Sequence, residues 1–191
     1  MENLDKNNET VKAVLALYEN HEEVPYINPK RDLEKWLQAV NIGSESLVPK
    51  RNMIRFPEDV LPGHLILLWR IQFGTFTTDS IFPKYFEYDY GINGSKALEE
   101  LVKKGFAQRM SAADSLHHLN AAQLKAILKQ NGLSGYSKLN KSELMDFAKE
   151  QLNEEQLAPA FDVRGYVLTD AGKALLEKHP EPVDRHPKKK Y

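Results

Sequence analysis

The sequence predicts a mostly α-helical protein with one small β-hairpin, an α+β fold, and three observations lead to this prediction. Apolar residues recur with helical spacing along much of the chain, and several of these segments end at a glycine, which readily adopts the left-handed conformation that terminates a helix. Two segments typical of short strands, residues 106–110 and 165–168, lie far apart in the sequence. Between them, residues 119–148 contain two short helices with their own start signals.

Residues 1–60 predict an N-terminal helical extension without a recognisable functional motif. Apolar residues between Val11 and Tyr18 outline one amphipathic helix, and Asp32 is a good N-cap for a second helix that ends near Gly43. The rest of this segment is rich in proline and charge and shows no clear period.

Residues 61–111 predict three helices and then a strand. The first helix begins at Pro62 and the second at Pro83, because proline is favoured in the first turn of a helix. Ser95 is the expected N-cap of the third helix, and Gly105 ends it.

Two phrases around the predicted strands resemble the winged-helix domain. LEELVKKGFAQR, residues 98–109, resembles its third helix and first hairpin strand, and YVLTDAGKALL, residues 166–176, resembles its returning strand and closing helix. The resemblance implies a winged-helix-like domain built from residues 61–111 and 163–180. Residues 112–162 would then be an insertion at the wing, which a hairpin tolerates because the entropy of loop closure grows only logarithmically with length.

The third helix of this domain predicts secondary nucleic-acid contacts at Ser95, Lys96 and Lys103. Glu99 and Glu100 on the same helix would oppose phosphates. A scaffold or dimerisation surface is therefore an alternative interpretation of this domain.

The insertion contains a pair of short helices whose ends are clear in the sequence. Asn120 with Gln123, and Asn140 with Glu143, have the spacing of capping boxes, in which side chain and backbone satisfy each other's hydrogen bonds. Gly132 lies where the first helix should stop. Each helix has one apolar face, so the two are expected to be stable only when packed together.

Lysines surround the connector between these two helices. Lys125 and Lys129 share one face of the first helix, and Lys138 and Lys141 flank the start of the second, where free N–H groups favour an anion. Tyr136 adds a group able to stack on a base or contact a phosphate. We interpret these residues as a phosphate-binding surface; alternatively, the lysines are solvated positions on a helical hairpin that contacts proteins.

Residues 116–152 resemble the helix-extended-helix group, which includes the SAP motif and the N-terminal unit of the transcription terminator Rho. The matching residues include Lys125, Gly132 and the run GYSKL at 135–139, followed by Lys141 and Ser142. The resemblance implies nucleic-acid contact, with DNA favoured over RNA, at the following residues: Lys125, Lys129, Gly135, Tyr136, Ser137, Lys138, Lys141 and Ser142.

Composition limits what this surface can do. The formal net charge is -1 and the pI about 6.6, so nucleic-acid binding has to come from local separation of charge. The segment 181–191 is rich in proline and lysine and predicts a flexible basic tail. The chain has no cysteine and no apolar stretch long enough for a membrane span, which favours a cytoplasmic protein without membrane contact.

No catalytic motif is present, so we predict a non-enzymatic protein without a cofactor. The side chains of the adjacent His117 and His118 are expected to diverge and would need a third ligand such as Asp114, so no metal site is predicted. The alternative function, from another class, is a protein-interaction adaptor without direct nucleic-acid contact.

Overall fold

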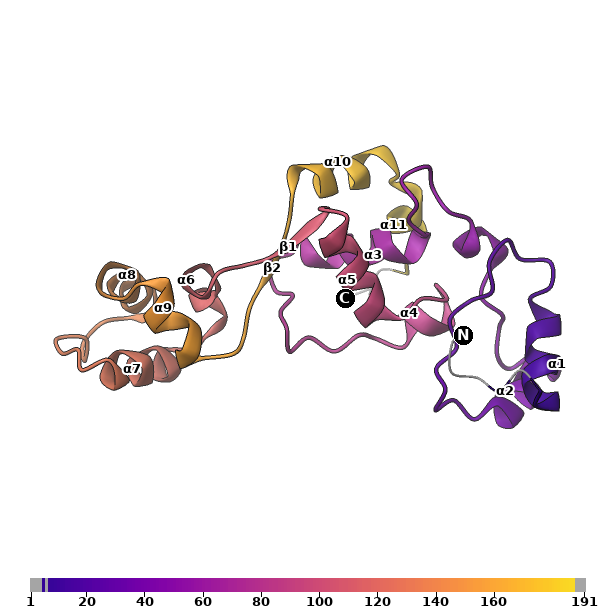
Figure 1. The fold of residues 1–191 in the computed structure, drawn as a ribbon, viewed down its shortest axis with the longest axis horizontal. Coiled ribbons are helices and arrows are strands. Elements are labelled where there is room, and N and C mark those ends of the chain that lie inside the picture. Colours follow the sequence, from indigo (N-terminus) through magenta and orange to yellow (C-terminus); the bar gives the residue numbers. More distant parts are fainter. Residues whose placement is uncertain (1–4, 6, 188–191) are drawn as a thin grey trace. The chain divides into compact units, whose positions relative to one another are not determined.

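The computed structural model describes residue 5 and residues 7–187, and its chain is mostly helical with one two-stranded antiparallel sheet (Figure 1). The predicted α+β class is therefore confirmed. The chain forms two compact units: unit 1 comprises Met1–Trp69, Ile81–Phe106 and Asp170–Tyr191, and unit 2 comprises Arg70–Ser80 and Ala107–Thr169. The four domains predicted from the sequence stay predictions.

Unit 1 is helical. Its elements are α1 (Glu9–Leu17), α2 (Leu33–Asn41), a short 3-10 helix η1 (Lys50–Met53), α3 (Pro62–Ile71, which continues into unit 2 after Trp69), α4 (Tyr85–Tyr88), α5 (Gly94–Lys103), α10 (Asp170–Lys178) and α11 (Glu181–Arg185). Helix α3 is the centre of the core, because four consecutive side chains, Leu65 to Leu68, are completely buried. The expected cap at Asp32 is confirmed, since its carboxylate accepts a hydrogen bond from Lys35 N at 3.1 Å.

Helix α5 begins earlier than the sequence predicts. Asn93, and not Ser95, is its N-cap, because the Asn93 side chain accepts hydrogen bonds from the backbone N–H groups of Ser95 and Lys96. Asparagine caps a helix as well as serine does, and it occurs first in the chain. Gly94 thus becomes the first helical residue, at a position where the ring of Phe82 occupies the space of a Cβ atom.

The first residues of the predicted flexible tail are helical in the structure. Residues 181–185 form α11, and Pro182 and His186 are buried. The Tyr90 hydroxyl lies 2.8 Å from His186 Nδ1, and the pKa of Tyr90 is raised to about 12, first of all by burial. Apolar and aromatic packing therefore orders this segment, and Lys188, Lys189 and Lys190 lie outside the described residues.

Unit 2 contains the sheet and the smaller helices. Its elements are β1 (Ala107–Arg109), α6 (Ala112–Ser115), η2 (Leu116–His118), α7 (Ala121–Gln130), α8 (Lys141–Gln151), α9 (Glu154–Leu157), η3 (Ala158–Ala160) and β2 (Tyr166–Leu168). Both predicted strands are confirmed. They pair antiparallel with Ala107 opposite Leu168 and Arg109 opposite Tyr166, and Thr77 adds a bridge to Gly165.

The segment between the two strands returns to the sheet through direct contacts. Met110 N donates to Gly165 O at 2.9 Å, and Gly165 N donates to the buried Ser115 hydroxyl at 3.0 Å. A side chain at Gly165 would collide with Met110 and His118, so glycine allows this close approach. These bonds hold the start and the end of the segment together.

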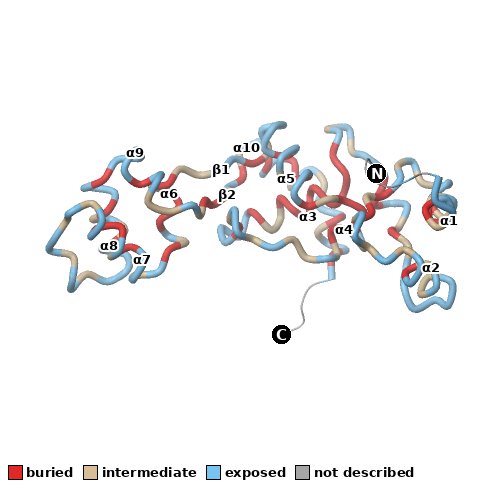
Figure 2. The backbone as a smooth tube through the Cα atoms, turned by 60° about the horizontal axis from the view of Figure 1, so that its bottom comes forward, coloured by how far each residue is buried: buried red, intermediate tan, exposed pale blue. Residues whose placement is uncertain are grey.

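Apolar side chains from α6 through α9 form one core within unit 2, seen as buried stretches of those elements in Figure 2. Its completely buried members are Ala112, Leu116, Leu124, Leu128, Leu144 and Leu157. Because each helix is short, this shared core is what stabilises them. Within residues 5 and 7–187, no helix combines the length and apolarity needed to cross a membrane.

Candidate nucleic-acid interface

The two helices of the candidate interface, α7 and α8, begin with reciprocal capping boxes. Asn120 N donates to Gln123 Oε1 at 2.8 Å while Gln123 N donates to Asn120 Oδ1 at 2.9 Å. Asn140 and Glu143 repeat the arrangement at the start of α8, with distances of 2.8 and 3.1 Å. Both predicted boxes are therefore confirmed.

The connector between α7 and α8 is shaped by two glycines in the left-handed region. Gly132 ends α7 with φ of 70°, and Gly135 has φ of 87°. Tyr136 follows and is half-buried, because its side chain packs against the apolar core of unit 2. The Tyr136 ring, which the sequence predicts as a stacking group, is therefore partly used in packing. Ser137 and Lys138 are exposed.

Two of the four predicted lysines are held by backbone carbonyl groups. Lys125 Nζ donates to Ser137 O at 2.8 Å. This bond holds the ammonium group of Lys125 at the connector, where Ser137 immediately precedes Lys138 in the sequence. Lys141 Nζ donates to His117 O, also at 2.8 Å. An ammonium group has three N–H donors, so each of these lysines keeps two donors and its full charge.

The other two lysines, Lys129 and Lys138, are exposed, and their ammonium groups form no hydrogen bond or ion pair with any described residue. None of the seven cations of residues 107–169 is paired with a carboxylate in the part of the chain that the structure describes. The four lysines at α7, the connector and α8 thus keep unneutralised positive charge.

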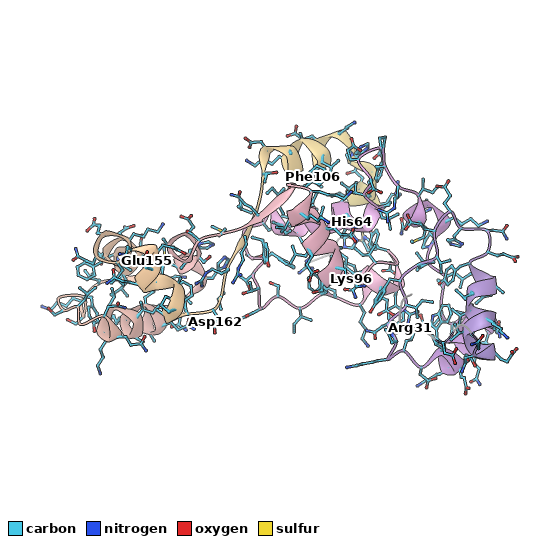
Figure 3. All side chains as sticks on the ribbon, viewed as in Figure 1. Arg31, His64, Lys96, Phe106, Glu155 and Asp162 are labelled. Atoms are coloured by element: carbon cyan, nitrogen blue, oxygen red, sulfur yellow. The ribbon has the colours of Figure 1, made fainter. Side chains whose placement is uncertain are left out.

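Carboxylates of unit 2 bond other groups or none. Glu154 accepts hydrogen bonds from the backbone N–H groups of Ala112 and Ala113 at 2.7 and 3.0 Å, which satisfies the first turn of α6. Glu155 and Asp162, labelled in Figure 3, have no cation partner among the described residues. In residues 107–169, the carboxylates and the lysines that the structure describes therefore form no ion pairs with one another.

The first turn of α8 offers less to a phosphate than the sequence predicts. The capping box occupies the backbone N–H groups of Asn140 and Glu143, and it places the Glu143 carboxylate beside the helix N-terminus. The N–H groups of Lys141 and Ser142 form no hydrogen bond with another described residue. The lysine side chains, rather than the helix terminus, are the main cationic feature of this surface.

A pair of histidines adjoins Lys141. The rings of His117 and His118 have centroids 3.9 Å apart, and the pKa of His118 is lowered by burial and by the neighbouring His117 and Lys141. His118 is therefore neutral at pH 7 and adds no charge to the surface. In residues 5 and 7–187, no group of three or more metal-ligating side chains is arranged to hold an ion.

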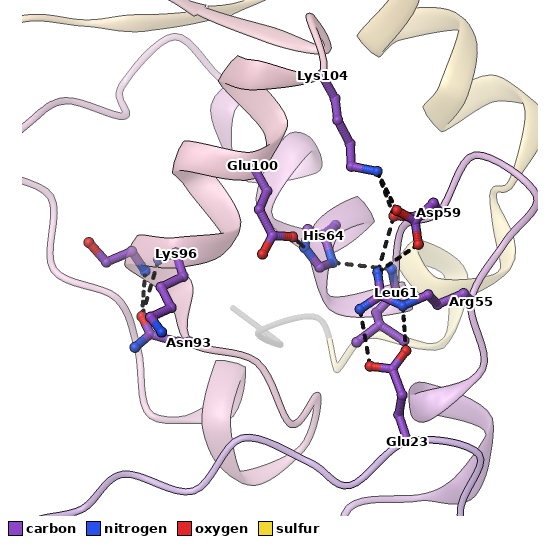
Figure 4. A network of polar contacts seen from close by, with 10 residues as sticks. Glu23, Arg55, Asp59, Leu61, His64, Asn93, Lys96, Glu100 and Lys104 are labelled. Atoms are coloured by element: carbon purple, nitrogen blue, oxygen red, sulfur yellow. Dashed lines mark hydrogen bonds and ion pairs between the residues drawn. The ribbon is translucent and has the colours of Figure 1, made fainter. Parts of the chain in front are cut away.

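The predicted secondary contacts lie in unit 1, on α5. Ser95 and Lys96 occupy its first turn, and Lys103 is its last residue. Glu100 lies on the same face of α5 as Lys96 and Lys103, and it accepts a hydrogen bond from the buried His64 at 3.1 Å in the polar network shown in Figure 4. Because His64 Nδ1 accepts from Leu61 N, its Nε2 carries the proton, and burial lowers its pKa.

Sequence reasoning missed the two long-range bonds of Lys125 and Lys141, because the acceptors are ordinary carbonyl groups 12 and 24 residues away. No side-chain pattern marks a carbonyl acceptor.

No protein-family model matches the chain, and comparisons with curated proteins and with solved structures likewise find nothing similar to it.

Proposed function

We propose that this protein is a non-enzymatic nucleic-acid-binding protein whose helix-extended-helix segment, residues 116–152, binds the sugar-phosphate backbone. The single observation that supports the proposal is the state of four lysine side chains: those of Lys125 and Lys141 are held by carbonyl groups, and the ammonium groups of Lys129 and Lys138 have no partner among the described residues. Because no carboxylate of the fold neutralises these lysines, they can bind the negatively charged phosphates of a nucleic acid.

The local charge balance supports backbone contact rather than base reading. Residues 119–148 contain these four lysines against only Glu143 and Asp146, in a chain whose net charge is -1. Contacts to phosphates carry no sequence information, so we expect little sequence preference. Exposed Ser137 and Ser142, with Gly135 between the helices, would allow a strand to approach closely.

The finer fold class is part of the same proposal. Pairing of β1 with β2 across the segment 110–165 supports a winged-helix-like arrangement in which a SAP-like unit replaces the wing. Ser95, Lys96 and Lys103 would be the secondary contacts. We favour DNA over RNA because of the SAP resemblance.

A protein-interaction adaptor is the second candidate. Ile42 and Ile81 support it, because these residues are 79% and 86% exposed. Single exposed apolar residues are common on protein surfaces, however, so they carry less weight than four unneutralised lysines.

The proposal is tested by titrating the full chain with single- and double-stranded DNA and RNA at two salt concentrations. Lys138→Glu combined with Lys141→Glu should weaken binding at low salt by at least about tenfold, because two attractive contacts become repulsive. The matched control is Lys35→Glu with Lys50→Glu, which reverses two exposed cations of unit 1 that pair with no described carboxylate.

Equal weakening by both double variants would show that only net charge matters and would contradict the proposed interface. Absence of nucleic-acid binding by the unaltered chain would favour the adaptor. Circular dichroism of each variant establishes that the fold is retained.

A further inference from the structure

Unit 1 contains a pocket of about 370 Å³ that the proposed nucleic-acid surface does not use. Its walls come from three segments of unit 1: residues 26–31, residues 82–88 around α4, and residues 92–95 at the start of α5. This volume lies near the lower end of the range found for pockets that bind small molecules. The volume therefore admits a small organic molecule and exceeds what one inorganic ion fills.

More positive than negative side chains line this pocket. Lys30, Arg31 and Lys84 line it with a single carboxylate, that of Glu87. Glu87 is already engaged, because it pairs with Arg31 and accepts a hydrogen bond from Asn28 N at 2.9 Å. Lys30 and Lys84 are exposed, and their ammonium groups have no partner among the described residues. The pocket is thus cationic.

Arg31 is a fixed part of the wall. Its side chain is only 6% exposed, and its guanidinium carbon lies 3.9 Å from the ring centroid of Tyr88 and 5.3 Å from that of Trp36. Its Nε atom is buried and has no hydrogen-bond partner in the part of the chain that the structure describes. A guanidinium held in this way keeps donors in one geometry, which lowers the entropic cost of binding an anion.

The start of α5 adds donors at the same pocket. This helix has ten residues and no acid in its first turn, and its N-terminal dipole favours an anion. The backbone N–H of Gly94 and the hydroxyl of Ser95 form no hydrogen bond with another described residue. Both residues line the pocket.

We propose that this pocket binds a small phosphate monoester. Its phosphate would contact Lys30, Lys84 and the donors at the start of α5, opposite the wall that Arg31 stiffens. A phosphate has three terminal oxygens and a double charge at neutral pH, so it satisfies more of these donors than a carboxylate does. The remaining volume holds the organic group. The inference is independent of the proposed function, because every lining residue belongs to unit 1.

Calorimetric titration of the full chain tests this inference, with glucose 6-phosphate, inorganic phosphate, glucose and potassium chloride as probes at constant ionic strength. Saturable binding of glucose 6-phosphate, with weaker binding of inorganic phosphate and none of glucose, is the expected result. Lys30→Glu with Lys84→Glu should weaken binding at least about tenfold. The control Lys35→Glu with Lys50→Glu, and the unit 2 variant Lys138→Glu with Lys141→Glu, should bind as the unaltered chain does.

Ser95→Asp separates loss of the site from loss of the fold. An acid in the first turn of α5 stabilises the helix, so Tm should be unchanged or higher while phosphate binding is lost. Binding of glucose 6-phosphate that survives both Ser95→Asp and the Lys30/Lys84 reversal would overturn the inference. Binding of inorganic phosphate alone, or of neither phosphate, would also overturn it.

Discussion

Units 1 and 2 use charged side chains in different ways. In unit 1, Arg31 pairs with Glu87, Arg55 with Glu23, and Lys178 with Glu58. In unit 2, the cations of residues 107–169 have no carboxylate partner among the described residues, and those with a partner, such as Arg164 and Lys125, donate to backbone carbonyl groups.

The difference indicates which charged side chains contribute to the stability of each unit. Unit 1 uses side-chain ion pairs to fix long loops, whereas unit 2 relies on capping boxes and a shared apolar core. The lysines of unit 2 can therefore be changed with little effect on the fold, and they remain available to bind an anion. The contrast between the units leads to four predictions, in order of decreasing effect.

Truncation of the buried arginine of unit 1 should have the largest effect. Arg31→Ala leaves the largely buried Glu87 unpaired, and loss of one partner of a buried pair costs about 3 kcal/mol in the free energy of unfolding. The matched truncation in unit 2, Lys138→Ala, should change it by no more than about 0.5 kcal/mol. Urea denaturation measures both, and similar costs would contradict the comparison.

Arg164→Ala should destabilise unit 2 by about 2 kcal/mol, because three carbonyl groups lose their donor. The Arg164 side chain donates to Phe161 O, Val163 O and Ala158 O at 2.7 to 2.9 Å, and the residue is 7% exposed. Arg164→Lys should recover only part of the loss, since one ammonium group lacks the fork of a guanidinium. The exposed Arg109→Ala is the control in the same urea experiment.

Acid should weaken unit 1 through Glu58. Hydrogen bonds from Lys178 first, and then from His179, lower the pKa of Glu58 from 4.5 to about 2. The unfolded chain therefore takes up this proton first, and stability is lost as pH falls from about 4.5 towards 2. Glu58→Gln should reduce this pH dependence of the urea midpoint, and an unchanged dependence would contradict it.

Glu143→Gln should raise nucleic-acid affinity about threefold, because it removes the one carboxylate at the start of α8. The box should persist, since Gln123 occupies the same position in the box of α7. Fluorescence anisotropy at low salt measures the gain. Asp146→Asn is the control on the same helix, and an affinity that falls in Glu143→Gln would argue against phosphate near this turn.

Much of the fold was predictable where the signal is local. The boxes at Asn120 and Asn140 and the stop at Gly132 depend on residues within four positions, so sequence alone identifies them. The start of α5 was wrong by two residues, because Asn93 and Ser95 are equally good caps and the helix uses the one that occurs first in the chain.

The candidate site was predictable in its residues but not in its geometry. The lysine spacing identifies a cationic segment, whereas the contacts of Lys125 with Ser137 and of Lys141 with His117 depend on how the chain folds back. The order of residues 181–186 was missed for the same reason, since it depends on Tyr90, 96 residues before His186. The structural role of Arg164 has no marker in the sequence.

The salt dependence of nucleic-acid affinity tests the central claim most directly. The logarithm of the affinity of the full chain should fall linearly with the logarithm of salt concentration, by about 0.9 per phosphate contact to duplex DNA. Lys138→Gln with Lys141→Gln should make this slope shallower by about 1.8, while Lys35→Gln with Lys50→Gln should leave it unchanged. An identical slope in all three proteins would contradict the claim that these lysines bind the phosphate backbone.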